Sequence, residues 1–172
     1  HITEEMHSVN QHLKHFFFVA EVVTVVPEVI NGDFVISKKQ LQTQIRNKKR
    51  DAIVIRTLPN LPDKKSKRYS NTNPTYLSEA AAIYLKENGI KHLLIDLPSV
   101  DKEKDGGQLL AHNAFWNTSG VLRMDATITE FIYVPNAVVD GEYLLNLMIA
   151  PFENDATPSK PILYKILVDE KK

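Results

Sequence analysis

The sequence predicts an α/β fold, with a mixed sheet flanked by helices. Three apolar segments rich in β-branched residues have the character of buried strands, at residues 19–26, 51–57 and 90–97. Helix signals lie between the first and second segments and between the second and third. A strand–helix–strand–helix–strand order indicates parallel pairing through right-handed crossovers.

Each of the two intervening helices has a recognisable start. Ser37 and Gln40 form the capping-box pattern, in which each side chain bonds the backbone near the other, so we expect a helix over 37–49. Ser78 caps the second helix and Gly89 ends it. Residues 58–74 are rich in Pro, Asn, Ser and Lys and predict a long loop, and loops of this length are often functional.

The last third of the chain has a different pattern. A short helix is expected over 109–116, and strands over 127–134, 143–150 and 162–168. Because no helix signal separates these three strands, we expect them to be antiparallel. The chain contains no internal repeat and no linker, so residues 1–172 are expected to form a single domain.

Composition excludes several classes of function. The chain has 21 basic and 21 acidic residues, so no excess of positive charge is available for nucleic acid. No apolar run approaches the ~18 residues of a membrane span, so we expect no membrane partner and a cytoplasmic location. There is no cysteine, which excludes a thiolate zinc site and a cysteine nucleophile. Any metal would therefore be bound by His, Asp or Glu.

Two residues are candidate metal ligands, and each has a plain structural alternative. His112 lies among apolar neighbours, and from the residues alone a core histidine with satisfied ring nitrogens explains it better than a metal ligand. Glu130 lies in a β-branched segment with no cation nearby, so it either faces solvent or is held by a metal. An imidazole and a carboxylate together suit zinc or manganese.

Other polar residues leave similar alternatives open. Asp96 and Asp101 could line a site at the end of a strand or cap their own loop. His12 and His15 have helical spacing, but a solvated helix face explains them at least as well as a metal site. The basic run at 63–68 is most simply a solvated loop, and it could also shape the entrance to a site or bind an anionic substrate.

Several segments, in matching order and spacing, resemble the cyclase family, which includes bacterial kynurenine formamidases. Residues 90–101 resemble the family's G-(I/V)-D-x-P-S-(V/I)-D segment, and the helix before them resembles its S-x-E-A-A-x-x-L element. Residues 110–116 and 128–132 are similar to the segments that carry a metal-binding His and Glu. Residues 151–161 resemble the family's closing loop, so the resemblance covers about residues 19–168.

The resemblance implies a swivelling β/β/α fold and metal-dependent hydrolysis of an amide. His112 and Glu130 would be ligands of a divalent zinc or manganese ion. The substrate would be a small molecule, namely N-formylkynurenine or a related amide or lactone, and the protein would be a homodimer or higher homo-oligomer. The alternative is a truncated or degenerate family member that acts as a structural or interaction module.

The family's H-x-G-T-H-x-D/E signature is not present in the sequence. His1 resembles the histidine that follows this signature, which serves the family as a general acid/base. We therefore expect the chain to be N-terminally truncated, with further metal ligands in the missing segment. Since a catalytic zinc site usually has about three protein ligands, we also expect little hydrolysis by the chain as given.

Overall fold

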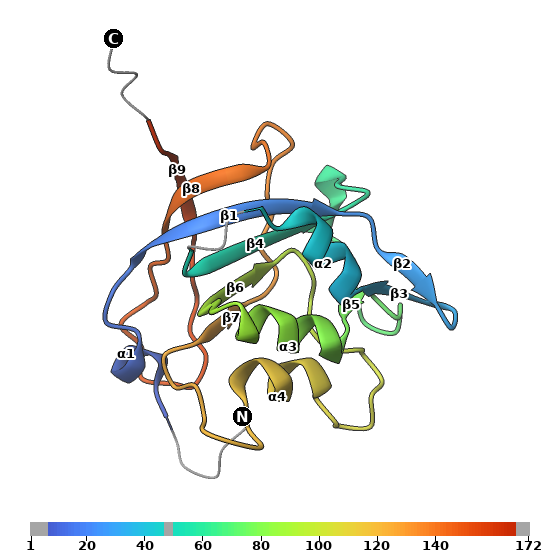
Figure 1. The fold of residues 1–172 in the computed structure, drawn as a ribbon, viewed down its shortest axis with the longest axis horizontal. Coiled ribbons are helices and arrows are strands. Elements are labelled where there is room, and N and C mark those ends of the chain that lie inside the picture. The colour runs from blue at the N-terminus through green and yellow to red at the C-terminus, as the bar shows by residue number, and fades with distance from the viewer. Residues whose placement is uncertain (1–6, 47–49, 168–172) are drawn as a thin grey trace.

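A computed structural model describes residues 7–46 and 50–167 and is built on a six-stranded sheet with the strand order β7-β6-β4-β1-β8-β9 (Figure 1). Its first four strands in that order run parallel, and the last two are antiparallel additions at one side. The strands are β1 (Phe17–Val25), β4 (Ala52–Thr57), β6 (His92–Ile95), β7 (Thr127–Thr129), β8 (Gly141–Asn146) and β9 (Ile162–Lys165).

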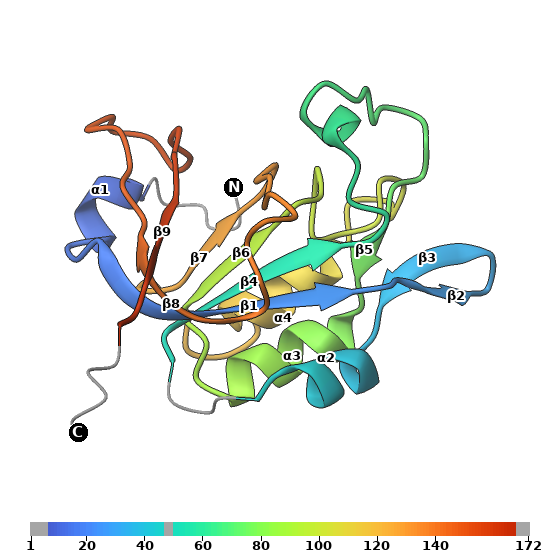
Figure 2. The same ribbon diagram turned by 90° about the horizontal axis from the view of Figure 1, so that it is seen from above.

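A smaller three-stranded sheet extends from the end of β1. It consists of β2 (Glu28–Ile30), β3 (Asp33–Ile36) and β5 (Tyr76–Leu77). The turn between β2 and β3 places both Asn31 and Gly32 at positive φ, which is the backbone of the type I′ hairpin that an Asn-Gly pair favours. Figure 2 shows this hairpin projecting away from the main sheet.

Three helices cover one face of the large sheet: α2 (Lys38–Gln44), α3 (Glu79–Glu87) and α4 (Leu110–Trp116) (Figure 2). The capping box of Ser37 and Gln40 is formed as expected, and Ser78 caps α3 through the Ala81 N–H. A one-turn helix α1 (Val9–His12) and a 3₁₀ helix η1 (Pro62–Lys65) lie in connecting segments. No helix within the described ranges is long and apolar enough to cross a bilayer.

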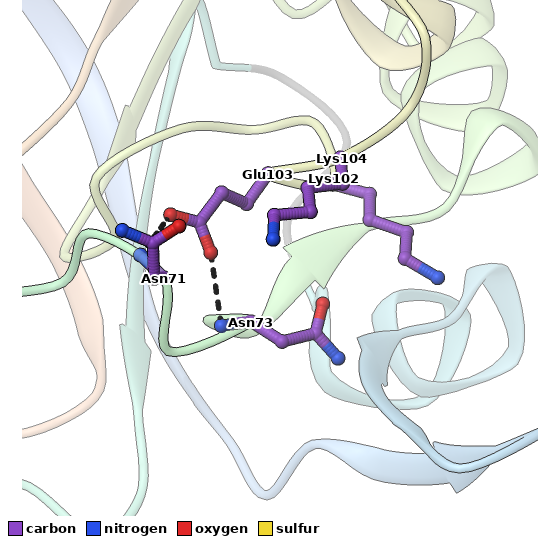
Figure 3. Close-up of a pocket in the computed structure, with 5 residues that line it drawn as sticks. All are labelled: Asn71, Asn73, Lys102, Glu103 and Lys104. Atoms are coloured by element: carbon purple, nitrogen blue, oxygen red, sulfur yellow. Dashed lines mark hydrogen bonds between the residues drawn. The ribbon is translucent and has the colours of Figure 1, made fainter.

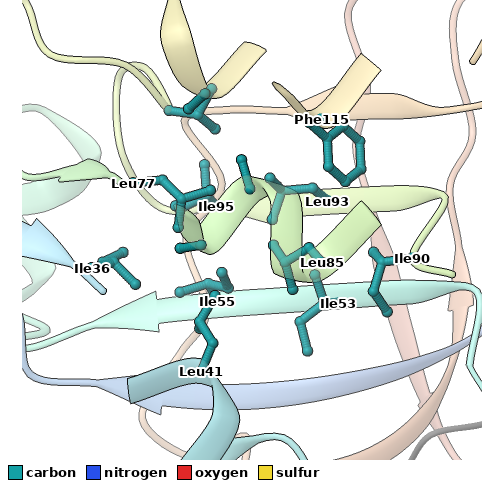
Figure 4. Packing of buried hydrophobic residues seen from close by; sticks show 14 of the residues in the cluster. Ile36, Leu41, Ile53, Ile55, Leu77, Leu85, Ile90, Leu93, Ile95 and Phe115 are labelled. Carbon is teal, nitrogen blue, oxygen red and sulfur yellow. The ribbon is translucent and has the colours of Figure 1, made fainter. Parts of the chain in front are cut away.

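The main core lies between this sheet face and the helices. Figure 4 shows Leu41 of α2, Leu85 of α3 and Phe115 of α4 converging on strand side chains such as Ile53 and Ile95. All five are fully buried. A second apolar cluster lies on the opposite face, where side chains of residues 132–138 and Leu147 pack against the strands in place of a helix. The sheet is therefore buried on both faces, as its apolar central strands require.

The parallel pairing of the first three predicted strands is confirmed, and so is the antiparallel pairing of the last two. Two expectations were wrong. The helix predicted over 37–49 ends at Gln44, because Ile45 turns to extended backbone; residues 47–49 lie outside the described part of the chain. The predicted strand 127–134 ends at Thr129 and runs parallel to β6, since the short helix α4 provides a crossover that puts it beside that strand.

Lowering the pH should destabilise the fold through His92. Its ring is buried against Phe18, with centroids 4.0 Å apart, and its Nδ1 lies 2.9 Å from the Thr127 hydroxyl. Burial lowers the His92 pKa to about 4, so between that value and the unfolded pKa of about 6.5 only the unfolded chain binds the proton. The His92 contribution is thus complete above pH 6.5 and is lost as the pH falls toward 4, by about 2 kcal/mol between pH 7 and pH 5.

The measurement is urea unfolding at both pH values for the wild type and His92→Asn. The asparagine amide can replace the polar contact to Thr127 but does not titrate. The wild type should therefore lose about 2 kcal/mol more than the variant on acidification. An equal loss in both proteins would show that His92 does not control this pH range.

Candidate functional site

The candidate residues lie where parallel strands end at one edge of the large sheet. Asp96 directly follows β6 and Glu130 directly follows β7. Asp101 and His112 come from the loop after β6 and from α4, which that loop precedes. Because parallel strands all end at the same edge, residues distant in sequence gather there, as in many α/β sites.

Asp101 orients His112. One carboxylate oxygen, Oδ1, accepts the N–H of Ala111 at the start of α4, and the other, Oδ2, lies 2.5 Å from His112 Nδ1. Asp101 therefore caps the helix and holds the ring at the same time. In the neutral ring this contact places the proton on Nδ1 and leaves Nε2 with a free lone pair, as in histidines that bind metals.

Glu130 faces the free nitrogen of that ring. His112 Nε2 and Glu130 Oε1 are 3.6 Å apart, and the Val100 N–H donates to Oε1 at 2.8 Å. The side chain is only partly accessible. Burial raises the pKa of the Glu130 carboxyl above its usual range, while the Val100 N–H and the nearby imidazole act in the opposite direction. A half-buried carboxyl that faces an imidazole nitrogen is well placed for a cation.

The two donors fit a divalent zinc or manganese ion in kind and spacing. Tetrahedral ligands at ~2.1 Å from an ion are roughly 3.4 Å apart, close to the observed separation. They do not make a complete site, because no group of three metal-ligating side chains occurs within residues 7–46 and 50–167. The structure thus brings His112 and Glu130 together, whereas the third candidate, His1, lies outside the described residues.

Asp101 is the functional contact that the sequence left undecided. The sequence allowed Asp101 either to line a site or to have a capping role. In the structure it does both, because it caps α4 and also contacts the candidate ligand His112. Its position in the loop that follows a predicted strand indicates a candidate site residue in the sequence. Its contact with His112, eleven residues later, depends on how that loop folds. The Trp116 ring packs against the other side of the site, with its centroid 5.2 Å from that of His112.

Asp96, by contrast, has a structural role. Its fully buried carboxylate accepts the N–H and hydroxyl of Thr57, and Oδ2 is 2.7 Å from Lys64 Nζ. The same ammonium group also donates to the Thr57 carbonyl oxygen. Lys64 belongs to η1 in the long loop, so this network ties the loop to the end of the sheet.

The histidines near the start of the chain do not share a helix face as their spacing suggested. Helix α1 ends at His12, so His15 lies beyond it. Neither residue belongs to a metal-ligating group within the described ranges.

Two cavities lie beside the site, over the loop that follows β6. The larger, about 310 Å³, is lined by Asn71, Asn73 and residues 102–104 (Figure 3). The Glu103 carboxylate accepts hydrogen bonds from the backbone N–H groups of Asn71 and Asn73. Dashed lines mark these bonds in Figure 3. The smaller cavity, about 230 Å³, includes Asp101 and therefore adjoins the His112 and Glu130 pair.

The chain is similar to a known protein family and to several solved structures. A family model described as putative cyclase matches residues 1–102, more than half of the chain. Among curated proteins no significant match is found.

Several solved structures have the same fold. One described as a potential metal-dependent hydrolase with cyclase activity has a TM-score of 0.61 at 15% identity and covers 92% of this chain and 75% of its own. A predicted metal-dependent hydrolase from Bacillus stearothermophilus has a TM-score of 0.62 at 17% identity, covering 95% and 69%. Isatin hydrolase A from Labrenzia aggregata has a TM-score of 0.58 at 12% identity, covering 85% and 60%. The expected cyclase-like fold is thus confirmed.

Replacing Lys64 by methionine should destabilise the protein by about 3 kcal/mol, because the buried Asp96 would lose its cation. Chemical denaturation of the wild type and variant measures this loss. Lys91→Met is the matched control, since its ion pair with Asp125 is half-exposed and should be worth less than about 1 kcal/mol. Equal effects of the two substitutions would contradict the role given to Lys64.

Proposed function

The chain belongs to the putative cyclase family, and from this we propose that it is a metal-dependent hydrolase that cleaves a small amide. The observation that carries the proposal is the approach of His112 Nε2 to Glu130 Oε1 at 3.6 Å, with Asp101 on the other ring nitrogen. The names of the similar structures, which include metal-dependent and isatin hydrolases, support the same reaction class. N-formylkynurenine or a related amide or lactone is the substrate we propose.

His112 and Glu130 would hold the divalent ion, zinc or manganese. When bound, such an ion supplies Lewis acidity, which makes water a nucleophile near neutral pH and polarises a carbonyl. The remaining ligands would come from outside the described residues, as the family signature implies. His1 would serve there as the general acid/base that moves a proton between water and the leaving amine.

The surrounding residues prepare these two donors. Asp101 keeps the neutral His112 ring in the tautomer whose Nε2 can bind a cation. The Val100 N–H holds Oε1 of Glu130, the oxygen that faces Nε2 of His112. Trp116 packs beside the imidazole and limits access of water to it.

A second candidate is a family member without catalysis, acting as a structural or interaction module. One observation favours it: the described ranges contain no set of three metal-ligating side chains. With only two donors, a divalent ion would be held too weakly to persist at ordinary concentrations. The two candidates therefore differ in whether metal binds at all.

The test compares the 172-residue chain with a chain extended at its N-terminus by H-x-G-T-H-x-D/E. We expect the extended chain to bind zinc or manganese stoichiometrically and to hydrolyse N-formylkynurenine, whereas the given chain should do neither appreciably. Elemental analysis and product absorbance provide the two measurements. In the extended chain, His112→Ala should reduce metal affinity about 100-fold or more, and Asp101→Asn by 10- to 100-fold.

His92→Asn is the control in the extended chain, because this buried histidine lies away from the donors and should leave metal content unchanged. Stoichiometric metal and metal-dependent turnover in the given chain would contradict the proposed ligand set. Absence of both in the extended chain would favour the non-catalytic candidate.

We also propose a homo-oligomer, most simply a dimer. Phe17, Leu144, Ile162 and Tyr164 share one face of β1, β8 and β9, as their strand register requires, and all four are exposed. The helices that cover this face elsewhere do not extend over β8 and β9 (Figure 2). An apolar surface beside an edge strand is a typical subunit contact.

Light scattering should therefore give a mass at least twice 19.5 kDa. Tyr164→Lys should shift the protein toward monomer, because it places a charge on this apolar face, whereas Lys39→Met on the exposed side of α2 should not. A monomeric wild type at high concentration would contradict the proposal.

A further inference from the structure

The middle of the long loop after β4 is packed only lightly. The side chains of residues 66–75 are all exposed or partly buried, and none of them belongs to either apolar cluster. Within this stretch the Thr72 N–H and hydroxyl both donate to the Tyr69 carbonyl oxygen, at 3.1 and 2.6 Å. A segment with so little buried apolar surface opens at a low cost in free energy unless groups outside it hold it in place.

Both ends of this stretch are fixed to buried structure. On one side, Lys64 Nζ lies 2.7 Å from Oδ2 of the buried Asp96. On the other side, Leu77 is fully buried in β5, pairs with β3 and donates its N–H to the Val100 carbonyl oxygen at 2.8 Å. Residues 66–74 therefore form a segment between two fixed points.

Between these points the segment is held by the carboxylate of Glu103. One oxygen accepts the Asn71 N–H, and the other accepts the Asn73 N–H at 3.0 Å (Figure 3). Asn71 and Asn73 have φ angles of 61° and 47°, a left-handed backbone that asparagine adopts more readily than most residues. Turns of this kind direct neighbouring N–H groups toward one point, where an anion binds. The loop is thus shaped around the carboxylate.

These hydrogen bonds keep Glu103 charged while leaving the contact reversible. The N–H groups of Asn71 and Asn73 hold the pKa of the Glu103 carboxyl below its usual range, and Lys104 acts in the same direction. Hydrogen bonds to a charged group are roughly twice as strong as those between neutral groups. Glu103 is nevertheless exposed, so water replaces its partners when the segment moves away.

The loop that carries Glu103 is itself well fixed. Lys102 Nζ lies 2.6 Å from Asp33 Oδ2 on β3, and the buried Asp101 contacts α4 and His112. Asp33 also accepts the side-chain amide of Asn73 at 2.7 Å, which supports the far end of the segment a second time. The Glu103 contact reaches further into the segment, at Asn71. Residues 66–74 are therefore the part expected to move.

The segment is also a wall of the cavity that adjoins the two candidate metal ligands. Lys67, Tyr69 and Pro74 line the cavity of about 230 Å³ that includes Asp101. Glu103 lines both this cavity and the larger one beside it, so it lies where the two loops meet. Movement of the segment away from Glu103 would widen the opening beside Asp101.

We propose that residues 66–74 are a lid over the candidate site and that Glu103 is the latch that keeps the lid closed. Its ends, at Lys64 and Leu77, stay in place when the latch opens. The inference rests on the proposed function only for what the opening admits, because the latch itself requires no metal.

Limited digestion of the 172-residue chain with trypsin measures the opening. Lys65, Lys67 and Arg68 are exposed cleavage points at the start of the lid, and mass spectrometry identifies cuts after them. When opening is fast relative to cleavage, the rate follows the population of the open form. Glu103→Ala should raise this rate about tenfold, because it removes two charge-assisted hydrogen bonds, and Glu103→Gln should raise it less, because it keeps one acceptor.

Amide hydrogen exchange distinguishes a lid from a general loss of stability. In Glu103→Ala the N–H groups of Asn71 and Asn73 should exchange about tenfold faster, whereas the Leu77 N–H should exchange as in the wild type. The midpoint of urea unfolding should not change. Glu87→Ala is the matched control, since it removes another exposed glutamate, on α3, and should alter neither cleavage nor exchange.

Equal rates of cleavage at residues 65–68 in the wild type and Glu103→Ala would overturn the inference. Faster exchange at Leu77 together with Asn71 would also overturn it, because the anchored end would then open as well. The result is independent of the proposed function. A Glu103-dependent lid without metal binding in the extended chain would keep the latch and remove the hydrolase, whereas metal-dependent turnover with no effect of Glu103→Ala on cleavage would do the reverse.

Discussion

The carboxylate of Asp101 connects the sheet edge to the helix that carries the candidate metal ligand. It is buried, and it contacts both the backbone at the start of α4 and the ring of His112. Helix α4 has no capping side chain at Leu109, so Asp101 supplies its cap from another part of the chain. The direction of α4, the tautomer of His112 and the path of the loop after β6 therefore depend on one group.

The same sheet edge collects polar groups that would otherwise be costly to bury. Asp96 and Asp101 follow β6, and Glu130 follows β7, yet each is neutralised differently. Asp96 contacts a lysine and a threonine, Asp101 contacts a histidine and the Ala111 N–H, and Glu130 accepts hydrogen bonds from the Val100 N–H and from Ser99. Burial raises the pKa of the Glu130 carboxyl, so a cation beside it would stabilise its charged form.

The long loop after β4 gives this edge a wall without adding to the core. Lys67, Tyr69 and Pro74 of this loop line the smaller cavity, and Lys64 ties the loop to the buried Asp96. A loop held by a few ionic contacts can change its other side chains without disturbing the core, because it has no apolar core of its own.

The sequence by itself determined the local structure. The strands at Val22, Ile53 and Leu93 and the helix starts at Ser37 and Ser78 followed from apolar runs and caps, which act over a few residues. His112 and Glu130 were named through a resemblance, and the structure brings them together, while their role as ligands stays a prediction.

Only the tertiary structure decided the parallel direction of β7, the pairing of Asp101 with His112 and the position of the cavity that Asp101 lines. A three-residue strand has too little pattern to indicate its partner, and a crossover through α4 sets its direction. Asp101 could cap its own loop, line a site or do both, and that choice depends on where a helix eleven residues later is packed. Local pattern carries no information on such contacts, because their free energy comes from groups that meet only after the sheet and helices have assembled.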